Sequence, residues 1–361
     1  MSIHFHALKV KEVKKETSDC VSVLFDVPEN LKEEFNFTQG QSLTMRAIIN
    51  GEEVRRTYSI CSSPLEHQLK VAIKKVEAGA FSIFANEQLK QHDLLEVMPP
   101  VGRFYTTLDA ANKKNYVAFA AGSGITPLLS IIKTTLATEP NSTFTLVYGN
   151  KTRASIIFFE ELEGLKNKYI NRFNLIHILS REKTDADLNF GRISKEKCND
   201  LFGKLLDVKT VDEFFICGPE DMIFSVKEFL ESKDVAEKKI HFELFTTPGQ
   251  NKSAVVSRES SATTAGPQSN ITVRLDGRSF DFSIPLNSDT SILDAAMQQG
   301  ADVPYACKGG VCCTCKAKLV EGEVKMDVHW GLEHEEIEQG FILTCQSHPL
   351  TEKVTVDFDV K

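Results

Sequence analysis

Four cysteines lie close together in the stretch CKGGVCCTC, from Cys307 to Cys315. Cys307, Cys312 and Cys315 have the spacing C-x4-C-x2-C, and Cys345 follows further along in FILTCQSHP. Three thiolates on one loop, with a fourth from a separate segment, form a donor set that holds a [2Fe–2S] cluster. Zinc is the alternative, although zinc sites favour paired C-x2-C halves and this sequence has no second pair. The spacing therefore predicts an iron–sulfur cluster with these four metal ligands.

Cys313 stands between two of the predicted ligands and is expected not to bind iron. Neighbouring residues cannot both turn toward one iron without distorting the loop, so Cys313 is assigned to packing beside the cluster. Gly309 and Gly310 lack side chains, which lets backbone N–H groups approach the sulfurs. The cysteines assigned to packing by default are Cys20, Cys61 and Cys198.

The rest of the composition favours a cytoplasmic protein. The N-terminal stretch MSIHFHALKVKEVKKE lacks the basic start, apolar core and cleavage site of a signal peptide. The longest apolar runs are too short to span a bilayer. The content of 42% hydrophobic and 25% charged residues is ordinary for a globular protein. Nine cysteines in such a chain indicate metal or redox chemistry rather than a disulfide framework.

The net charge of −8 is concentrated near the C-terminus. Residues 271–361 contain 8 Lys and Arg against 15 Asp and Glu, a net charge of −7. Such a module repels nucleic-acid phosphates, so no nucleic acid is expected as a partner. It can instead steer toward a basic patch on a protein. Solubility alone is the other explanation.

The pattern of apolar segments predicts a multidomain chain that combines β and α/β folds. Residues 1–110 contain short alternating segments between turn residues, which predict an antiparallel β-barrel. Residues 111–246 alternate apolar strands with helical stretches, which predict βα units on a parallel sheet. Residues 247–270, rich in Ser, Thr, Gly and Pro, predict a flexible linker. Residues 271–361 begin with alternation around Asp276-Gly277, a hairpin signal, and continue with the helical stretch SILDAAMQQG.

The first functional signal of the barrel region is Arg56-Thr57-Tyr58-Ser59. A guanidinium suits a diphosphate through paired hydrogen bonds, and an aromatic ring suits the face of a flat heterocycle. The tetrad resembles the R-x-Y-S pattern of the ferredoxin–NADP reductase superfamily. The resemblance implies that Arg56 meets the flavin pyrophosphate, that Tyr58 lies against the isoalloxazine, and that the Ser59 hydroxyl approaches flavin N5. The alternative for Tyr58 is an ordinary aromatic on the barrel surface.

Two further stretches follow in the order of that family. Gly79-Ala80-Phe81-Ser82 precedes a helical run and resembles the G-x-x-S turn whose backbone N–H groups bind phosphate at a helix start. Pro100-Val101-Gly102-Arg103-Phe104 resembles the P-x-G-x-F segment that closes the flavin barrel. Ordered motifs support one another, so FAD binding is predicted. The residues expected to bind FAD are Arg56, Thr57, Tyr58, Ser59, Gly79, Phe81, Ser82 and Gly102, and of these Tyr58 and Ser59 are also expected to be catalytic.

Two glycine-containing loops are expected to receive the nicotinamide dinucleotide. AAGSGITPLLSII follows the strand YVAFA and resembles the superfamily's G-x-G-x-x-P loop, although glycines also serve tight turns. CGPEDMI, at the end of another apolar strand, resembles the family's C-G-P segment near the nicotinamide ring. Cys217 is therefore expected to be catalytic, and the alternative is a small buried apolar residue. The residues assigned to this site are Gly122, Gly124, Thr126, Pro127, Cys217, Gly218 and Pro219.

Ser180-Arg181 ends the strand NLIHILS, where this family binds the adenosine ribose. A hydroxyl and a guanidinium suit a 2′-phosphate, whereas a carboxylate suits the free diol of NADH. The pair predicts NADPH, and NADH stays open because Glu182 is adjacent. Arg153 and Arg192 are additional candidates without an assignment.

Phe245, in HFELFTTP, is a candidate for the second face of the flavin. In related reductases an aromatic residue near this point covers that face. The chain has 24 Phe, however, and most phenylalanines belong to cores.

The full set of motifs resembles the reductase components of bacterial multicomponent oxygenases, which carry a plant-type [2Fe–2S] domain after the flavin and nicotinamide domains. The resemblance covers essentially the whole chain and implies a β-grasp fold for residues 271–361. It implies that electrons pass from NADPH through FAD and a [2Fe–2S] cluster to an oxygenase protein. The di-iron oxygenase that epoxidises phenylacetyl-CoA is the expected acceptor. Alternatives are an aromatic-ring hydroxylase or the hybrid cluster protein as acceptor, or a non-catalytic redox sensor.

The acidic stretch GLEHEEIEQG is the expected docking surface for the acceptor. Its carboxylates would attract a basic partner. The residues of this predicted surface are Glu333, Glu335, Glu336 and Glu338.

Overall fold

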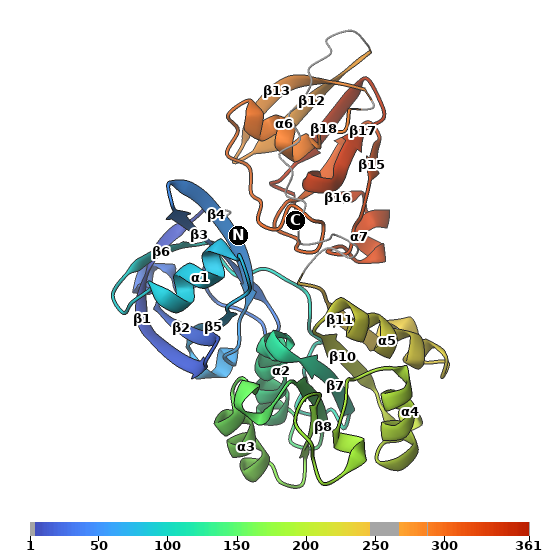
Figure 1. Cartoon of the computed structure of the whole chain (residues 1–361). Helices are drawn as coiled ribbons and strands as arrows, with labels where there is room; N and C mark the ends of the chain where they lie inside the picture. Colours follow the sequence, from blue (N-terminus) through green and yellow to red (C-terminus); the bar gives the residue numbers. More distant parts are fainter. Residues whose placement is uncertain (1–3, 246–266, 287, 361) are drawn as a thin grey trace. The chain divides into compact units, whose positions relative to one another are not determined.

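The computed structural model describes residues 4–245, 267–286 and 288–360 (Figure 1). The chain divides into two compact units, residues 1–245 and 246–361. Within the described residues, no helix combines the length and the apolar character needed to cross a membrane. Most of the predicted linker, residues 247–266, lies outside the described residues. Its last three residues, Gln268–Asn270, already belong to a strand, because the Ser269 side chain is buried and donates a hydrogen bond to the Thr351 carbonyl.

The first part of the larger unit is an antiparallel sheet of six strands in the order β4-β3-β6-β1-β2-β5. An antiparallel bridge between Ile60 and Val71 joins the two ends of this order and closes the barrel. The inward positions of the strands are apolar and form one core with Phe81 of the helix α1. The elements are β1 (His6–Thr17), β2 (Cys20–Asp26), β3 (Ser42–Ile49), β4 (Glu52–Ser59), β5 (Leu69–Lys74), α1 (Ala80–Glu87) and β6 (Leu94–Val97).

The second part is a parallel sheet of five strands in the order β11-β10-β7-β8-β9. Helices α2 and α3 cover one face, and α4 and α5 cover the other (Figure 1). Because both faces are covered, the central strands are continuously apolar rather than alternating. The elements are β7 (Asn115–Ala121), α2 (Ile125–Thr138), β8 (Thr143–Asn150), α3 (Phe159–Lys168), β9 (Phe173–Leu179), α4 (Lys195–Lys204), β10 (Glu213–Cys217), α5 (Glu220–Glu231) and β11 (Ile240–Glu243).

The barrel and the parallel sheet are held together by polar contacts between the barrel and α2. The Ser130 hydroxyl donates to the Ser62 carbonyl at 2.6 Å, and the Ser63 and Thr134 hydroxyls lie 2.9 Å apart. Lys133 forms ion pairs with Glu66 of the barrel and with Glu161 of α3. These buried and half-buried contacts fix the two parts as one unit.

The smaller unit contains a mixed sheet of five strands in the order β13-β12-β18-β14-β16, with a separate β15-β17 pair. β12 and β18 are parallel, and the other pairs are antiparallel. The predicted hairpin is confirmed, because Asp276 and Gly277 have φ values of 51° and 68°, as a tight two-residue turn requires. The arrangement is the predicted β-grasp fold. The elements are β12 (Gln268–Leu275), β13 (Arg278–Pro285), α6 (Ile292–Gln298), β14 (Lys316–Glu321), β15 (Val324–Met326), α7 (His334–Glu338), β16 (Phe341–Leu343), β17 (Ser347–Pro349) and β18 (Lys353–Asp357).

Candidate functional site

A hydrogen bond joins the end of a barrel strand to the end of a strand of the parallel sheet. The hydroxyl of Ser59, the last residue of β4, donates to Oε2 of Glu243 at 2.9 Å. Glu243 is the last residue of β11, and burial raises the pKa of its carboxyl group to about 7, against the lowering effect of the Ser59 hydroxyl. The pair therefore places a hydroxyl and a carboxyl that titrates near neutral pH between the two parts of the unit.

Glu243 is a candidate site residue that the sequence pattern did not reveal. In HFELFTTP the aromatic Phe245 was the predicted residue, and it lies 41% exposed at the last described position of this unit. The available signal was a single carboxylate within an apolar strand, at the carboxyl end where parallel sheets carry their ligand-binding residues. Its partner is 184 residues away in the chain.

The remaining residues of the R-x-Y-S tetrad divide between the two faces of β4. Arg56 and Tyr58 project to the same side, because alternate residues of a strand share a face. Arg56 is exposed and its guanidinium also donates to the Arg55 carbonyl at 2.7 Å. The Tyr58 ring lies 5.6 Å from the Phe81 ring, and burial raises the pKa of its hydroxyl. Thr57 faces the other way, with its hydroxyl 3.3 Å from that of Thr44.

The start of α1 offers backbone rather than side-chain groups to a ligand. Gly79 is the N-cap, and a Cβ there would press on Val76 and on the Ser82 hydroxyl. That hydroxyl accepts from the Val76 N–H at 3.1 Å and donates to the Gly79 carbonyl at 3.0 Å. Phe81 is buried in the barrel core. Phe81 and Ser82 therefore shape the turn, and the uncapped N-terminus of α1 remains suited to a phosphate.

Gly102 lies in the connection between β6 and β7, which also contains the predicted domain boundary at residue 110. Its φ of 128° belongs to the region that favours glycine. The Gln41 amide donates to the Gly102 carbonyl, and Val101 pairs with Ser42 in an isolated bridge. The P-x-G-x-F segment thus lies against the barrel strand β3.

The two glycine loops of the parallel sheet lie in direct contact. A Cβ at Gly124 would overlap the carbonyl of Cys217, and a Cβ at Gly218 would lie 3.1 Å from the Ala121 backbone nitrogen. Gly122, with a φ of 54°, accepts a hydrogen bond from the Tyr148 hydroxyl at 2.9 Å. Glycine is required here for close approach of two backbones at the carboxyl edge of the sheet.

The other residues of the two loops form the starts of helices α2 and α5. Thr126 is buried in the first turn of α2, and its hydroxyl donates to the Ser123 carbonyl at 3.0 Å. Pro127 is buried in the same turn, where its missing N–H is not needed. Pro219 is the N-cap of α5.

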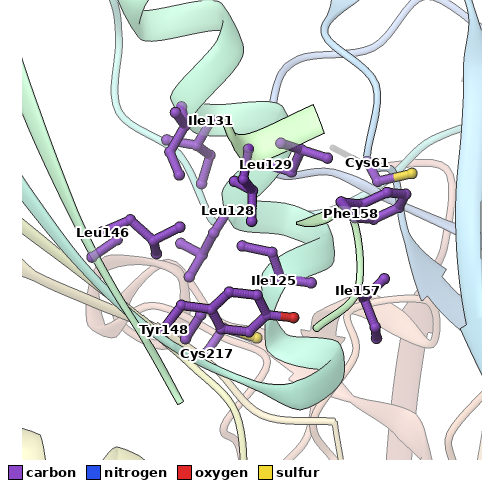
Figure 2. Packing of buried hydrophobic residues seen from close by; sticks show 14 of the residues in the cluster. Cys61, Ile125, Leu128, Leu129, Ile131, Leu146, Tyr148, Ile157, Phe158 and Cys217 are labelled. Atoms are coloured by element: carbon purple, nitrogen blue, oxygen red, sulfur yellow. The ribbon is translucent and has the colours of Figure 1, made fainter. Parts of the chain in front are cut away.

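Cys217 is fully buried in the hydrophobic cluster between the sheet and α2, together with Tyr148 and Ile125 (Figure 2). Burial raises the pKa of its thiol well above 9.0, so the sulfur is a neutral thiol at neutral pH. Its position at the end of β10 agrees with the sequence analysis. A role in acid–base or nucleophilic chemistry does not fit this environment, because the thiolate is the reactive species. The packing alternative describes the side chain better.

Ser180 and Arg181 follow directly after β9, where their N–H groups donate to the carbonyls of Asn150 and Lys151. Arg181 is exposed. Glu182 is engaged elsewhere, because its carboxylate accepts the Arg153 N–H at 2.8 Å. The Arg153 guanidinium lies 4.7 Å from the centre of the Phe159 ring and lines a surface hollow of about 430 Å³. Arg192, also predicted only as an additional candidate, lies exposed beyond β9.

The four predicted cluster cysteines form two adjoining pairs. The Cys312 thiol donates to the Cys307 sulfur at 3.2 Å, and this bond, with the Gly309 N–H at 3.3 Å, lowers the pKa of Cys307. Cys315 pairs with Cys345, and this hydrogen bond together with burial raises the pKa of Cys315. Among the described residues, no three His, Cys, Asp or Glu side chains are grouped as ligands of one metal ion. Two soft thiolates for each of two irons is the donor set that a [2Fe–2S] cluster takes.

These features fit the predicted groups. The thiol pairs match a two-iron cluster, the uncapped α1 and the R-x-Y-S face suit a flavin diphosphate, and the glycines at Gly124 and Gly218 bring two loop backbones together at the carboxyl edge of the sheet. Cys313 is half-exposed beside the pairs, and its assignment as a non-ligand stays a prediction.

Three families match the chain in the predicted order. They are the oxidoreductase FAD-binding domain over residues 7–105, the oxidoreductase NAD-binding domain over residues 119–228, and the 2Fe-2S iron-sulfur cluster binding domain over residues 273–350.

Two known proteins are similar over almost their whole length. One component of the 1,2-phenylacetyl-CoA epoxidase of Escherichia coli K12 is 48% identical over 99% of this chain and 98% of its own. The ferredoxin reductase component of 3-ketosteroid-9-alpha-monooxygenase from Rhodococcus rhodochrous is 33% identical over 97% and 96%.

Solved structures share the fold. Phthalate dioxygenase reductase, described as a modular structure for electron transfer from pyridine nucleotides to [2Fe-2S], has a TM-score of 0.59 at 24% identity and 98% coverage of each chain. An intact type IV self-sufficient cytochrome P450 monooxygenase has a TM-score of 0.68 at 20% identity, with 98% of this chain matching 41% of that one.

Proposed function

Because this chain belongs to the family of electron-transfer reductases built from FAD-binding, NAD-binding and [2Fe–2S] domains, we propose that it is the reductase of an oxygenase that epoxidises phenylacetyl-CoA. The observation that carries this proposal is 48% identity over 99% of the chain to a component of such an epoxidase. The chain is an oxidoreductase that uses a nicotinamide cofactor, whereas its acceptor, its preference between NADPH and NADH and its docking surface are proposed.

When bound, FAD would supply two-electron hydride chemistry with the nicotinamide, and the [2Fe–2S] cluster would supply one-electron transfer. The chain's own residues hold and orient these groups. Tyr58 offers an aromatic plane and Arg56 a guanidinium on one face of β4. Ser59 and Glu243 together hold a proton near neutral pH where β4 and β11 meet. The thiolates that would hold the cluster are Cys307, Cys312, Cys315 and Cys345.

The proposal is tested by NADPH-driven oxygen uptake in the presence of the purified oxygenase subunits. We expect uptake that requires phenylacetyl-CoA and yields its ring epoxide. Rapid reduction of cytochrome c without this coupled turnover would leave the reductase chemistry in place and refute the named acceptor. In that case an aromatic-ring hydroxylase or the hybrid cluster protein becomes the acceptor to test.

We also propose that NADPH is preferred over NADH. Ser180 and Arg181 follow the carboxyl end of β9, and Glu182, the carboxylate that would favour NADH, accepts a hydrogen bond from the Arg153 N–H. An Arg–phosphate contact of this kind contributes about 1.5–3 kcal/mol. Arg181→Ala should therefore lower kcat/KM for NADPH by about tenfold or more. Its kcat/KM for NADH should stay within about twofold of the wild type, and equal losses with both cofactors would contradict the proposal.

The acceptor is proposed to dock on the acidic surface around α7. Glu333, Glu335 and Glu338 are exposed there and support this proposal. Glu336 does not belong to the surface as predicted, because its carboxylate is buried, pairs with Lys316 at 2.8 Å and accepts the Glu333 N–H. Reversing the three exposed charges to Lys should weaken acceptor reduction and flatten its dependence on salt. Unchanged kinetics would refute this surface.

A further inference from the structure

Trp330 is the only tryptophan of the chain, and it is 42% exposed. It lies between β15 and α7, directly before Gly331 and Leu332. A single exposed apolar side chain is ordinary at a protein surface. Trp330 is of interest because of the contacts that its segment makes.

This segment packs on the loop that carries the outer cysteine pair. The Gly331 N–H donates to the Gly310 carbonyl at 2.9 Å. A Cβ at Gly331 would lie 2.9 Å from the Cys312 carbonyl oxygen, and a Cβ at Gly310 would lie 2.6 Å from Cγ2 of Val328. The backbone on either side of Trp330 is therefore in close contact with the backbone of the cluster loop.

The cluster loop is more exposed on this side than on the other. Cys307 and Cys312 are half-exposed, whereas Cys315 and Cys345 are buried. Electron transfer to a protein acceptor favours the side where the cluster approaches the surface, and here that side carries the outer pair. Trp330 lies next to this exposed side of the cluster loop.

Buried contacts tie the segment and α7 to the inner cysteine pair. Glu336 of α7 pairs with Lys316, the residue after Cys315, and its carboxylate also accepts the Glu333 N–H at 3.0 Å. The Thr344 N–H and hydroxyl both donate to the Cys315 carbonyl. A partner bound to α7 and to Trp330 would thus be held in a fixed position relative to the sulfurs.

We propose that Trp330 is the apolar anchor at the centre of the docking surface, and that its occupant is an oxygenase protein with basic residues around an apolar pocket. The inference rests on the proposed function in that it requires a protein acceptor. A basic partner is proposed because residues 271–361 have a net charge of −7 and because exposed carboxylates follow Trp330 in the sequence, at Glu333, Glu335 and Glu338. Protein interfaces combine a buried aromatic anchor with a charged rim, and tryptophan is enriched among the residues that dominate binding.

Phe280 supplies a matched control. It is an aromatic residue of the same domain and is 38% exposed. It lies on β13, at one edge of the sheet, whereas β14 and β16, next to the cluster cysteines, form the other edge. The variants Trp330→Ala, Trp330→Phe and Phe280→Ala therefore separate the docking role from a general loss of exposed apolar area.

The experiment measures coupled NADPH oxidation against the concentration of the phenylacetyl-CoA oxygenase subunits. Ferricyanide reduction and the visible spectrum of the cluster serve as controls for the flavin and for cluster assembly. Trp330→Ala should raise the apparent KM for the oxygenase by about 10- to 30-fold, with ferricyanide reduction and the spectrum unchanged. Trp330→Phe should recover most of this loss, and Phe280→Ala should match the wild type. The salt dependence of Trp330→Ala should keep the wild-type slope, because rim charges and not the anchor set it.

An apparent KM within about twofold of the wild type for Trp330→Ala, or an equal rise for Phe280→Ala, would overturn the inference. If the wild-type protein fails to turn over the phenylacetyl-CoA oxygenase, the proposed function is refuted and the same variants are compared with cytochrome c, a basic haem protein. In that arm, selective loss at Trp330→Ala supports the anchor, and equal rates for all variants overturn it.

Discussion

The contact between Ser59 and Glu243 can be tested through the pH dependence of stability. The carboxyl of Glu243 has its pKa raised from 4.5 to about 7 by burial, so the folded protein binds a proton that the unfolded chain releases. Below pH 4.5 the carboxyl group is protonated in both states, so it does not lower the free energy of unfolding. As the pH rises from 4.5 to about 7, the unfolded chain releases the proton first and the free energy of unfolding falls. Glu243→Gln removes this penalty because the amide does not ionise.

The magnitude follows from the raised pKa. At 1.36 kcal/mol per pKa unit, Glu243→Gln should stabilise the larger unit by about 1 kcal/mol at pH 5.5 and by up to about 3 kcal/mol at pH 8.5. The amide oxygen of Gln can still accept from Ser59, so little is lost in return. For a unit of this size, the gain at pH 8.5 corresponds to a rise in Tm of roughly 6–12 °C.

A double-mutant cycle with Ser59→Ala sharpens the test. A hydrogen bond to an ionised carboxylate contributes about 1.5–3 kcal/mol, and one to a neutral acceptor about 0.5–1.5 kcal/mol. The coupling between the two residues should therefore be larger at pH 8.5 than at pH 5.5. Scanning calorimetry of the four proteins at both pH values measures it. A Tm of Glu243→Gln that stays at or below the wild type at pH 8.5, or a coupling that is equal at both pH values, would refute the reasoning.

Three further predictions concern the loops and the cluster. Gly124→Ala forces a methyl group into the Cys217 carbonyl, so it should destabilise the larger unit by about 1–3 kcal/mol and slow flavin reduction by NADPH, as calorimetry and stopped-flow absorbance would show. Glu336→Gln leaves Lys316 without its buried partner and should lower the stability of the cluster domain by about 2–4 kcal/mol, measured by the loss of cluster absorbance on heating. Cys313→Ser should retain the iron content of the wild-type protein, whereas loss of iron would make Cys313 a ligand.

Features carried by one continuous stretch were predicted well from the sequence. The Asp276-Gly277 turn needs two residues with positive φ, and the sequence supplies a pair that tolerates it. Gly124 and Cys217 were each marked by a motif at a strand end, although their contact was not predicted. The spacing placed three cysteines on one loop and Cys345 apart from them, and their assignment as cluster ligands stays a prediction.

Features that depend on distant residues were not predicted. Glu243 gains its role from Ser59, and nothing in either local stretch reports the other. Glu336 was counted with its acidic neighbours, but one helical turn brings it to the inner face of α7, where Lys316 pairs with it. The sequence left Cys217 open between a catalytic role and a buried apolar position, and its burial between the sheet and α2 is a property of the tertiary packing.

Charge and packing differ between the two units, and the difference corresponds to two steps of electron transfer, which are hydride transfer and delivery to a protein acceptor. Hydride transfer requires that the nicotinamide and flavin rings are held in position within a fraction of an ångström. The larger unit has closely packed backbones at Gly124 and a buried carboxyl group at Glu243. The first 270 residues carry a net charge of only about −1. Delivery to a protein acceptor requires a surface that attracts, binds and releases. The cluster domain accordingly carries most of the negative charge and the exposed Trp330. A chain that only sensed redox state would not need the FAD-binding and NAD-binding domains, and their presence therefore supports catalysis by hydride transfer.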